Sequence, residues 1–216
     1  MHDSVKNLIY IEDLVKSRVN HDKLLKIIAV SKTFPIENIL PLIEHGHLHF
    51  GENKVQEALD KWSDIKIDNH DIKLHLIGRL QSNKVRTALK IFDYIHSLDS
   101  EKLAIKIANE QAKKEKKPKI FIQVNIGNEE QKSGIDKKIL NDFYKFCKNL
   151  NLNIIGTMCI PPNDGNIEKY FSEMNDVNKE LNFKELSMGM SEDYVEAIKN
   201  NATYIRVGSK IFGSRT

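Results

Sequence analysis

Eight short apolar runs divide this chain, and a helical or capping segment follows each of them. The runs cover residues 24–30, 47–50, 74–78, 94–98, 120–126, 154–160, 184–188 and 203–208. Alternating strands and helices favour a parallel sheet, because each helix returns the chain to the same end of the sheet. Eight such units favour closure into a barrel over an open sheet. The sequence therefore predicts an α/β fold, a (β/α)8 barrel of the TIM type.

An extra helix is predicted ahead of the first strand, over residues 3–20, with Asp3 or Ser4 as its N-cap. Apolar residues recur there at helical spacing. They are Leu8, Ile11, Val15 and Val19. With 40% hydrophobic and 29% charged residues, the chain can bury a substantial core. No Gly/Ser-rich or Pro-rich linker divides it, so residues 1–216 are expected to form a single domain.

Charge and cysteine usage exclude several classes of protein. The formal charge of +3 comes almost wholly from scattered lysines, which argues against binding to nucleic acid. The N-terminus carries acids and no segment is apolar over a spanning length, so neither a signal peptide nor a membrane span is expected. Cys147 and Cys159 are too few for a disulfide framework. A cytoplasmic protein is predicted.

Polar and glycine residues gather where the predicted strands end. In a barrel, the loops that follow the strands converge on the mouth and carry the functional residues. The residues at these ends are Ser31, Lys32, Gly51, Glu52, Asn53, Gly78, Asn125, Arg206, Gly208 and Ser209. Lys32 follows an apolar run, where partial desolvation would disfavour its ammonium form. A neutral amine can attack an aldehyde; the alternative is an ordinary surface lysine at a loop start.

The last two loops have the composition of a phosphate site. Barrels often bind phosphate between the loops after strands seven and eight, at a helix N-terminus. Here these loops span residues 187–193 and 206–213, in which Gly189 and Gly208 permit close backbone approach. Ser191 and Ser209 supply hydroxyls. The alternative is ordinary helix capping, which would account for each loop separately.

Arg206 lies inside an apolar strand, where a guanidinium is costly unless it meets an acceptor. A ligand ring nitrogen could be that acceptor, or a carboxylate such as Glu52 could form a salt bridge with it.

His45, His47 and His49 could place two imidazoles on one strand face, but no carboxylate or cysteine stands at metal-binding spacing, so no metal is expected. The usual nucleotide-binding fingerprints are also absent from the sequence.

Six segments together resemble the pyridoxal phosphate homeostasis protein family, also called the proline synthase co-transcribed homologue family. They are IIAVSKTFP, HFGENKVQE, LHLIGRLQSNKVR, QVNIGNEEQKSGI, ELSMGMSEDYVEAI and IRVGSKIFG, in the family's order. The resemblance implies the fold-type III barrel shared with the N-terminal domain of alanine racemase. It also implies pyridoxal 5′-phosphate (PLP) as cofactor, held as a Schiff base on Lys32.

The resemblance also assigns the rest of the cofactor site. Arg206 would contact the pyridine nitrogen, the backbone of Gly208 and Ser209 would contact the phosphate together with Ser191, and Asn53 would line the pocket. Phe34 stands where many bacterial relatives have a second lysine, so any role of that lysine is lost. Lys132 matches another family lysine, either in a mobile surface loop or in cofactor transfer.

The implied function is that of a PLP carrier or regulator in vitamin B6 and amino-acid homeostasis. Arginine at the pyridine nitrogen leaves the ring a poor electron sink. Alanine racemase has a second domain that contributes a tyrosine base, and no part of this chain is expected to form such a domain. A PLP-dependent amino-acid racemase is therefore the less favoured function. A third candidate function is that of a cofactor-free aldolase or isomerase that acts through Lys32. A monomer is expected, with apo PLP-dependent enzymes as candidate recipients.

Overall fold

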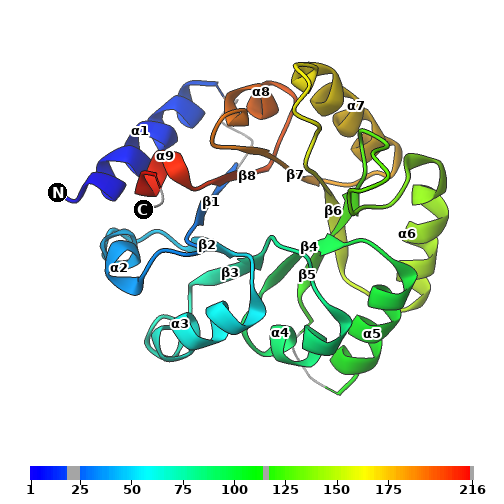
Figure 1. The fold of residues 1–216 in the computed structure, drawn as a ribbon, viewed down its shortest axis with the longest axis horizontal. Coiled ribbons are helices and arrows are strands. Elements are labelled where there is room, and N and C mark those ends of the chain that lie inside the picture. The colour runs from blue at the N-terminus through cyan, green and yellow to red at the C-terminus, as the bar shows by residue number, and fades with distance from the viewer. Residues whose placement is uncertain (19–24, 114–116, 215–216) are drawn as a thin grey trace.

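The structure, a computed structural model, describes residues 1–18, 25–113 and 117–214. Over these ranges, eight parallel strands close into a barrel in chain order (Figure 1). The strands are β1 (Lys26–Val30), β2 (His49–Glu52), β3 (Lys73–Leu76), β4 (Tyr94–Leu98), β5 (Lys119–Val124), β6 (Ile154–Cys159), β7 (Glu185–Met190) and β8 (Tyr204–Val207). Every one overlaps a run predicted from the sequence, so the predicted (β/α)8 barrel is confirmed.

Helices form a ring around the barrel (Figure 1). They are α1 (Asp3–Arg18), α2 (Ile36–Glu44), α3 (Val55–Asp68), α4 (Val85–Ile91), α5 (Glu101–Gln111), α6 (Leu140–Asn149), α7 (Ile167–Glu180), α8 (Tyr194–Lys199) and α9 (Ser209–Phe212). Short 3-10 turns, η1 (Ser82–Lys84) and η2 (Lys137–Ile139), precede α4 and α6. The predicted N-terminal helix is confirmed as α1. Residues 19 and 20 of that prediction, and residue 24 of the first predicted strand, lie outside the described residues.

The first and last strands complete the barrel by pairing in parallel. Ile28 of β1 lies opposite Arg206 of β8. Because all neighbouring strands are parallel, their C-terminal ends emerge on one face. The extra helix α1 lies beside α9 near this closure, where the Asn7 amide donates to the Ile211 carbonyl at 3.0 Å. The polar loop residues predicted from the sequence therefore share one face of the molecule.

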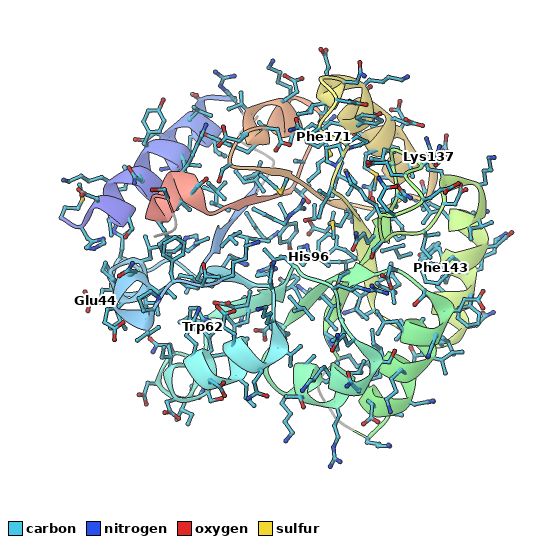
Figure 2. All side chains as sticks on the ribbon, viewed as in Figure 1. Glu44, Trp62, His96, Lys137, Phe143 and Phe171 are labelled. Carbon is cyan, nitrogen blue, oxygen red and sulfur yellow. The ribbon has the colours of Figure 1, made fainter. Side chains whose placement is uncertain are left out.

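The hydrophobic core has two layers. The larger lies between the barrel and its helices, where Trp62 of α3, Phe143 of α6 and Phe171 of α7 are buried (Figure 2). The smaller fills part of the barrel interior. It consists of Ile28, Tyr94, Phe121, Met158 and Tyr204. Packing on both faces of the strands holds their ends rigidly, which a site built from several loops requires.

Candidate functional site

A cavity of about 830 Å³ opens at the C-terminal ends of the strands. All six residues that the sequence assigns to a ligand site line it. They are Lys32, Asn53, Ser191, Arg206, Gly208 and Ser209. They come from the loops after β1, β2 and β7 and from the end of β8. The fold thus brings an amine, a guanidinium, hydroxyls and a glycine turn to one cavity from distant parts of the chain.

Lys32 is half-buried in the turn that follows β1. Two residues further on, Phe34 is buried and its ring centroid lies 4.9 Å from that of Phe212 on α9. Phe34 therefore packs the β1–α2 loop against α9.

Arg206 is 4% exposed and lines the cavity from the inner face of the barrel. One terminal nitrogen donates to Ser187 Oγ at 2.8 Å and the other to the Cys159 carbonyl at 2.9 Å. Burial lowers the pKa of this guanidinium, while the nearby Cys159 thiol and Asp193 carboxylate oppose that shift. An arginine has five N–H donors, so others remain for an acceptor in the cavity.

The salt bridge considered between Arg206 and Glu52 is wrong. Side chains alternate between the two faces of a strand, and Glu52 points outward into the layer between β2 and α3. There its Oε1 accepts from Lys61 and from the Trp62 indole, both at 3.0 Å. Arg206 points inward, so the barrel wall separates the two groups.

A chain of polar contacts, half-buried at His49 and buried from His75 onward, leads to Arg206 across the barrel interior. His49 Nδ1 lies 2.9 Å from His75 Nε2, and His75 Nδ1 lies 3.0 Å from His96 Nε2. His96 Nδ1 then lies 2.9 Å from Ser187 Oγ, which accepts from Arg206. His96 is at the centre of the barrel (Figure 2). The rings thereby support the serine that orients the arginine.

The sequence analysis did not predict these histidine contacts, because it considered only histidines that lie on one strand. The available signal was across strands, since the runs that became β2, β3 and β4 each carry a histidine, at positions 49, 75 and 96. A neutral middle ring fits this arrangement, since it can donate to one neighbouring imidazole and accept from the other. Burial agrees with this, because desolvation lowers the pKa of His75 and His96 well below the usual value.

These neutral histidines predict acid sensitivity of the fold. Burial lowers the pKa of His49 to about 4, against about 6.5 in an unfolded chain. Between these values the unfolded chain binds more protons than the folded one, so stability falls as pH decreases through that window. Urea unfolding from pH 7 to pH 4.5 should show this fall, and His75→Gln should flatten it. His70→Gln, at an exposed position, is the control; an unchanged slope in His75→Gln would contradict the assignment.

The loops after β7 and β8 are joined by a hydrogen bond. The Gly208 N–H donates to Ser191 Oγ at 3.1 Å, so this N–H already has an acceptor in the protein. Ser191 keeps its own hydroxyl proton to donate into the cavity. Gly208 precedes α9, whose first N–H groups, starting with Ser209, lack intrahelical acceptors. The donors for an anion are therefore the Ser191 hydroxyl and the start of α9.

Asn53 and Lys132 complete the rim of the cavity. A Cβ atom at Gly78 would lie 2.4 Å from the Asn53 carbonyl, so the glycine allows the loops after β2 and β3 to approach each other. Lys132 forms an ion pair with Glu129 at 2.6 Å, and its side chain is 36% exposed. It faces the cavity with its charge already balanced.

Among the described residues, no three His, Cys, Asp or Glu side chains are grouped so as to hold a metal ion. None of the helices in the described ranges has both the length and the apolar content needed to cross a membrane.

Comparison with known proteins places this geometry in a class. The family model for the alanine racemase N-terminal domain matches residues 13–216. Alanine racemase from Clostridium difficile 630 shares the fold, at 12% identity and a TM-score of 0.72 over 99% of this chain and 57% of that one. The fold and site thus define a barrel of the alanine racemase N-terminal-domain class.

Closer relatives identify the family within this class. The pyridoxal phosphate homeostasis protein of Pasteurella multocida is 37% identical over 97% of both chains. The structure of PipY from Synechococcus elongatus PCC7942 with PLP bound is 33% identical, with a TM-score of 0.87 over 97% of this chain and 100% of that one. The chain belongs to the pyridoxal phosphate homeostasis protein family.

Proposed function

We propose that this protein binds PLP as a Schiff base on Lys32 and acts as a carrier or regulator in intracellular PLP and amino-acid homeostasis. The observation that carries the proposal is the convergence of Lys32, Arg206 and Ser191 on one cavity. The PLP-bound PipY structure supports the same cofactor. Apo PLP-dependent enzymes are the proposed recipients, and the protein is proposed to act as a cytoplasmic monomer.

The residues present fit the chemistry of PLP. Lys32 offers an amine for an aldehyde, and the Ser191 hydroxyl with the first N–H groups of α9 offers donors for a phosphate. Arg206, which can only donate, would hold a ring nitrogen in its unprotonated form. Asn53 would close the side of the pocket. When bound, PLP supplies an aldehyde and an electron-withdrawing ring.

Reduction with borohydride tests the proposal directly. Protein mixed with PLP should become yellow, and borohydride should bleach the colour and leave a pyridoxyl label on the Lys32 peptide. No colour and no label would instead favour a cofactor-free aldolase or isomerase, in which Lys32 reacts with a carbonyl substrate.

A second expected result is the absence of substantial racemase activity. Racemisation needs a proton removed on one face of the substrate and delivered on the other, so Lys32 would require a partner base. Within the described part of the chain, the cavity lining contains no tyrosine. The PLP-loaded protein should racemise L-alanine far below the ordinary enzyme range of about 1 to 1,000 turnovers per second. A chiral assay with an authentic alanine racemase as positive control decides this; turnover within that range would establish the alternative, an amino-acid racemase.

A further inference from the structure

The residues on either side of Lys32 are both bound to carboxylates outside the barrel. Ser31 is fully buried, and its hydroxyl donates to Glu52 Oε1 at 2.8 Å. The backbone N–H of Thr33 donates to Glu57 Oε1 at 2.5 Å. Glu52 ends β2 and Glu57 lies in the first turn of α3. The main chain on both sides of Lys32 is therefore fixed at two points, by hydrogen bonds to β2 and to α3.

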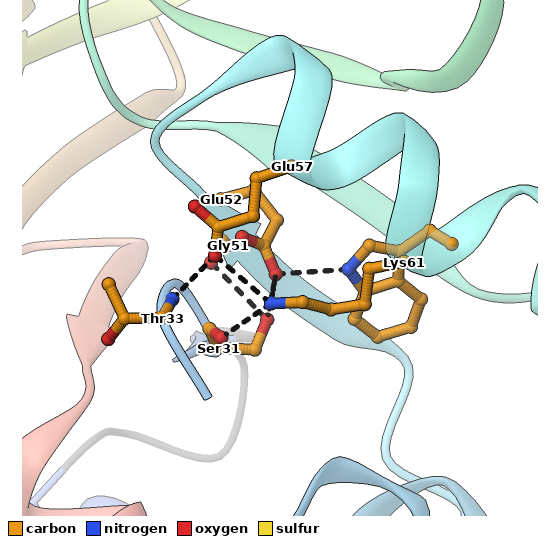
Figure 3. A network of polar contacts seen from close by, with 7 residues as sticks. Ser31, Thr33, Gly51, Glu52, Glu57 and Lys61 are labelled. Carbon is orange, nitrogen blue, oxygen red and sulfur yellow. Dashed lines mark hydrogen bonds and ion pairs between the residues drawn. The ribbon is translucent and has the colours of Figure 1, made fainter. Parts of the chain in front are cut away.

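Lys61 of α3 joins these two points into one network (Figure 3). Its Nζ lies 3.0 Å from Glu52 Oε1, 3.2 Å from Glu57 Oε1 and 3.0 Å from the Ser31 carbonyl. An ammonium has three N–H donors, and these contacts use all of them. The side chain is only 10% exposed, so solvent screens the interactions little.

The backbone at Thr33 needs such support. Its φ is +68°, in the left-handed region that β-branched residues rarely adopt. A strained residue persists only where surrounding contacts determine its conformation, and such residues gather at functional sites. The hydrogen bond from the Thr33 N–H to Glu57 is a contact of this kind, directly beside Lys32.

General stabilisation alone is a weak explanation for this network. Glu52 is fully buried, and in the described part of the chain its Oε2 has no hydrogen-bond partner. The desolvation of buried charges offsets much of their mutual attraction, so apolar packing would serve stability as well. Burial also opposes ionisation of Glu57, but the Thr33 N–H and the Lys61 ammonium outweigh it and lower the pKa of this carboxyl. The negative charge that holds Thr33 is thus kept at neutral pH.

We propose that Lys61, with Glu52 and Glu57, is a positioning group that fixes residues 31–33 so that the Lys32 amine meets the PLP aldehyde. Lys61 does not itself contact the cofactor in this scheme. The inference rests on the proposed function, because it assumes that Lys32 is the residue that captures PLP.

Lys61→Met tests the proposal, since it keeps an unbranched apolar stem and removes the charge. Covalent capture of PLP, followed by stopped-flow absorbance in the full-length protein, should slow by about tenfold to a hundredfold, the range expected when a reacting group is displaced by about 1 Å. Hydrogen exchange of the Thr33 amide, measured without PLP, should accelerate. Lys61→Arg, which restores the charge, should recover much of the capture rate.

Lys66→Met is the matched control on the same helix. Lys66 is also largely buried, and it forms an ion pair with Asp93 at 2.6 Å below the barrel, ahead of β4. This variant should lower the unfolding temperature to a comparable degree and leave the capture rate unchanged. If Lys61→Met fails to fold, Glu57→Ala replaces it, since this partly exposed helix position frees the Thr33 N–H without burying a new group.

The outcomes separate this inference from the proposed function. A pyridoxyl label on a lysine other than Lys32 in the unaltered protein would refute the proposed function. A label on Lys32, with equal capture rates in Lys61→Met, Lys66→Met and the unaltered protein, would refute the positioning role alone. Slower capture and faster Thr33 exchange in Lys61→Met, but not in Lys66→Met, would establish it.

Discussion

Replacing Lys32 with alanine should abolish covalent capture of PLP and leave the fold intact. Lys32 lies in the turn after β1 and lines the cavity, whereas the residues before it form the core of the strand. Substitutions outside the core usually change stability by about 0.5 kcal/mol or less, and Lys32 is not a core residue. Absorbance titration and mass spectrometry after borohydride reduction should detect no pyridoxyl adduct, while the circular dichroism spectrum and urea midpoint stay unchanged.

Lys132→Ala is the control for that experiment. Lys132 also lines the cavity, but its ammonium is paired with Glu129. Its removal should leave the amount of captured PLP unchanged. A pyridoxyl label that persists on Lys132 in the Lys32→Ala protein, at the level found in the unaltered protein, would remove Lys32 from the centre of the site.

The sequence was sufficient to predict the barrel because that prediction depends on local patterns. Each strand is a short apolar run, and each helix has its own apolar spacing, so no distant contact has to be known. The cavity follows from the same argument, since parallel strands deliver their C-terminal ends to one face. Lys32, Arg206 and Ser191 could therefore be brought together before any distance was known.

The partners of the buried polar groups were not predictable in this way. Whether Glu52 points inward or outward depends on where β2 ends, and the predicted strand stopped at residue 50, whereas β2 continues to Glu52. The contact between His96 and Ser187 joins strands that are not neighbours in the barrel. Such contacts depend on register and on the barrel radius, which the sequence pattern does not contain.

Gly208→Val should weaken PLP binding by about tenfold to a hundredfold, or about 1.4 to 2.8 kcal/mol. A Cβ atom at this position would lie 3.3 Å from the Val30 Cβ and 3.4 Å from the Val30 carbonyl, and both residues line the cavity. A branched side chain must therefore push β8 away from β1 or enter the space beside the start of α9. Either change displaces the N–H groups and the Ser191 hydroxyl that we propose as phosphate donors.

Comparing PLP with pyridoxal separates loss of the phosphate site from general distortion. Pyridoxal lacks the phosphate, so its weaker binding uses Lys32 and the ring contacts alone and should change little in Gly208→Val. Gly208→Ala adds only the Cβ atom, which the Val30 side chain can accommodate with a small shift, so its effect on PLP should be intermediate. Absorbance titrations of both ligands measure the difference. Equal losses for PLP and pyridoxal would indicate distortion of the barrel mouth, and an unchanged affinity for PLP would place the phosphate away from α9.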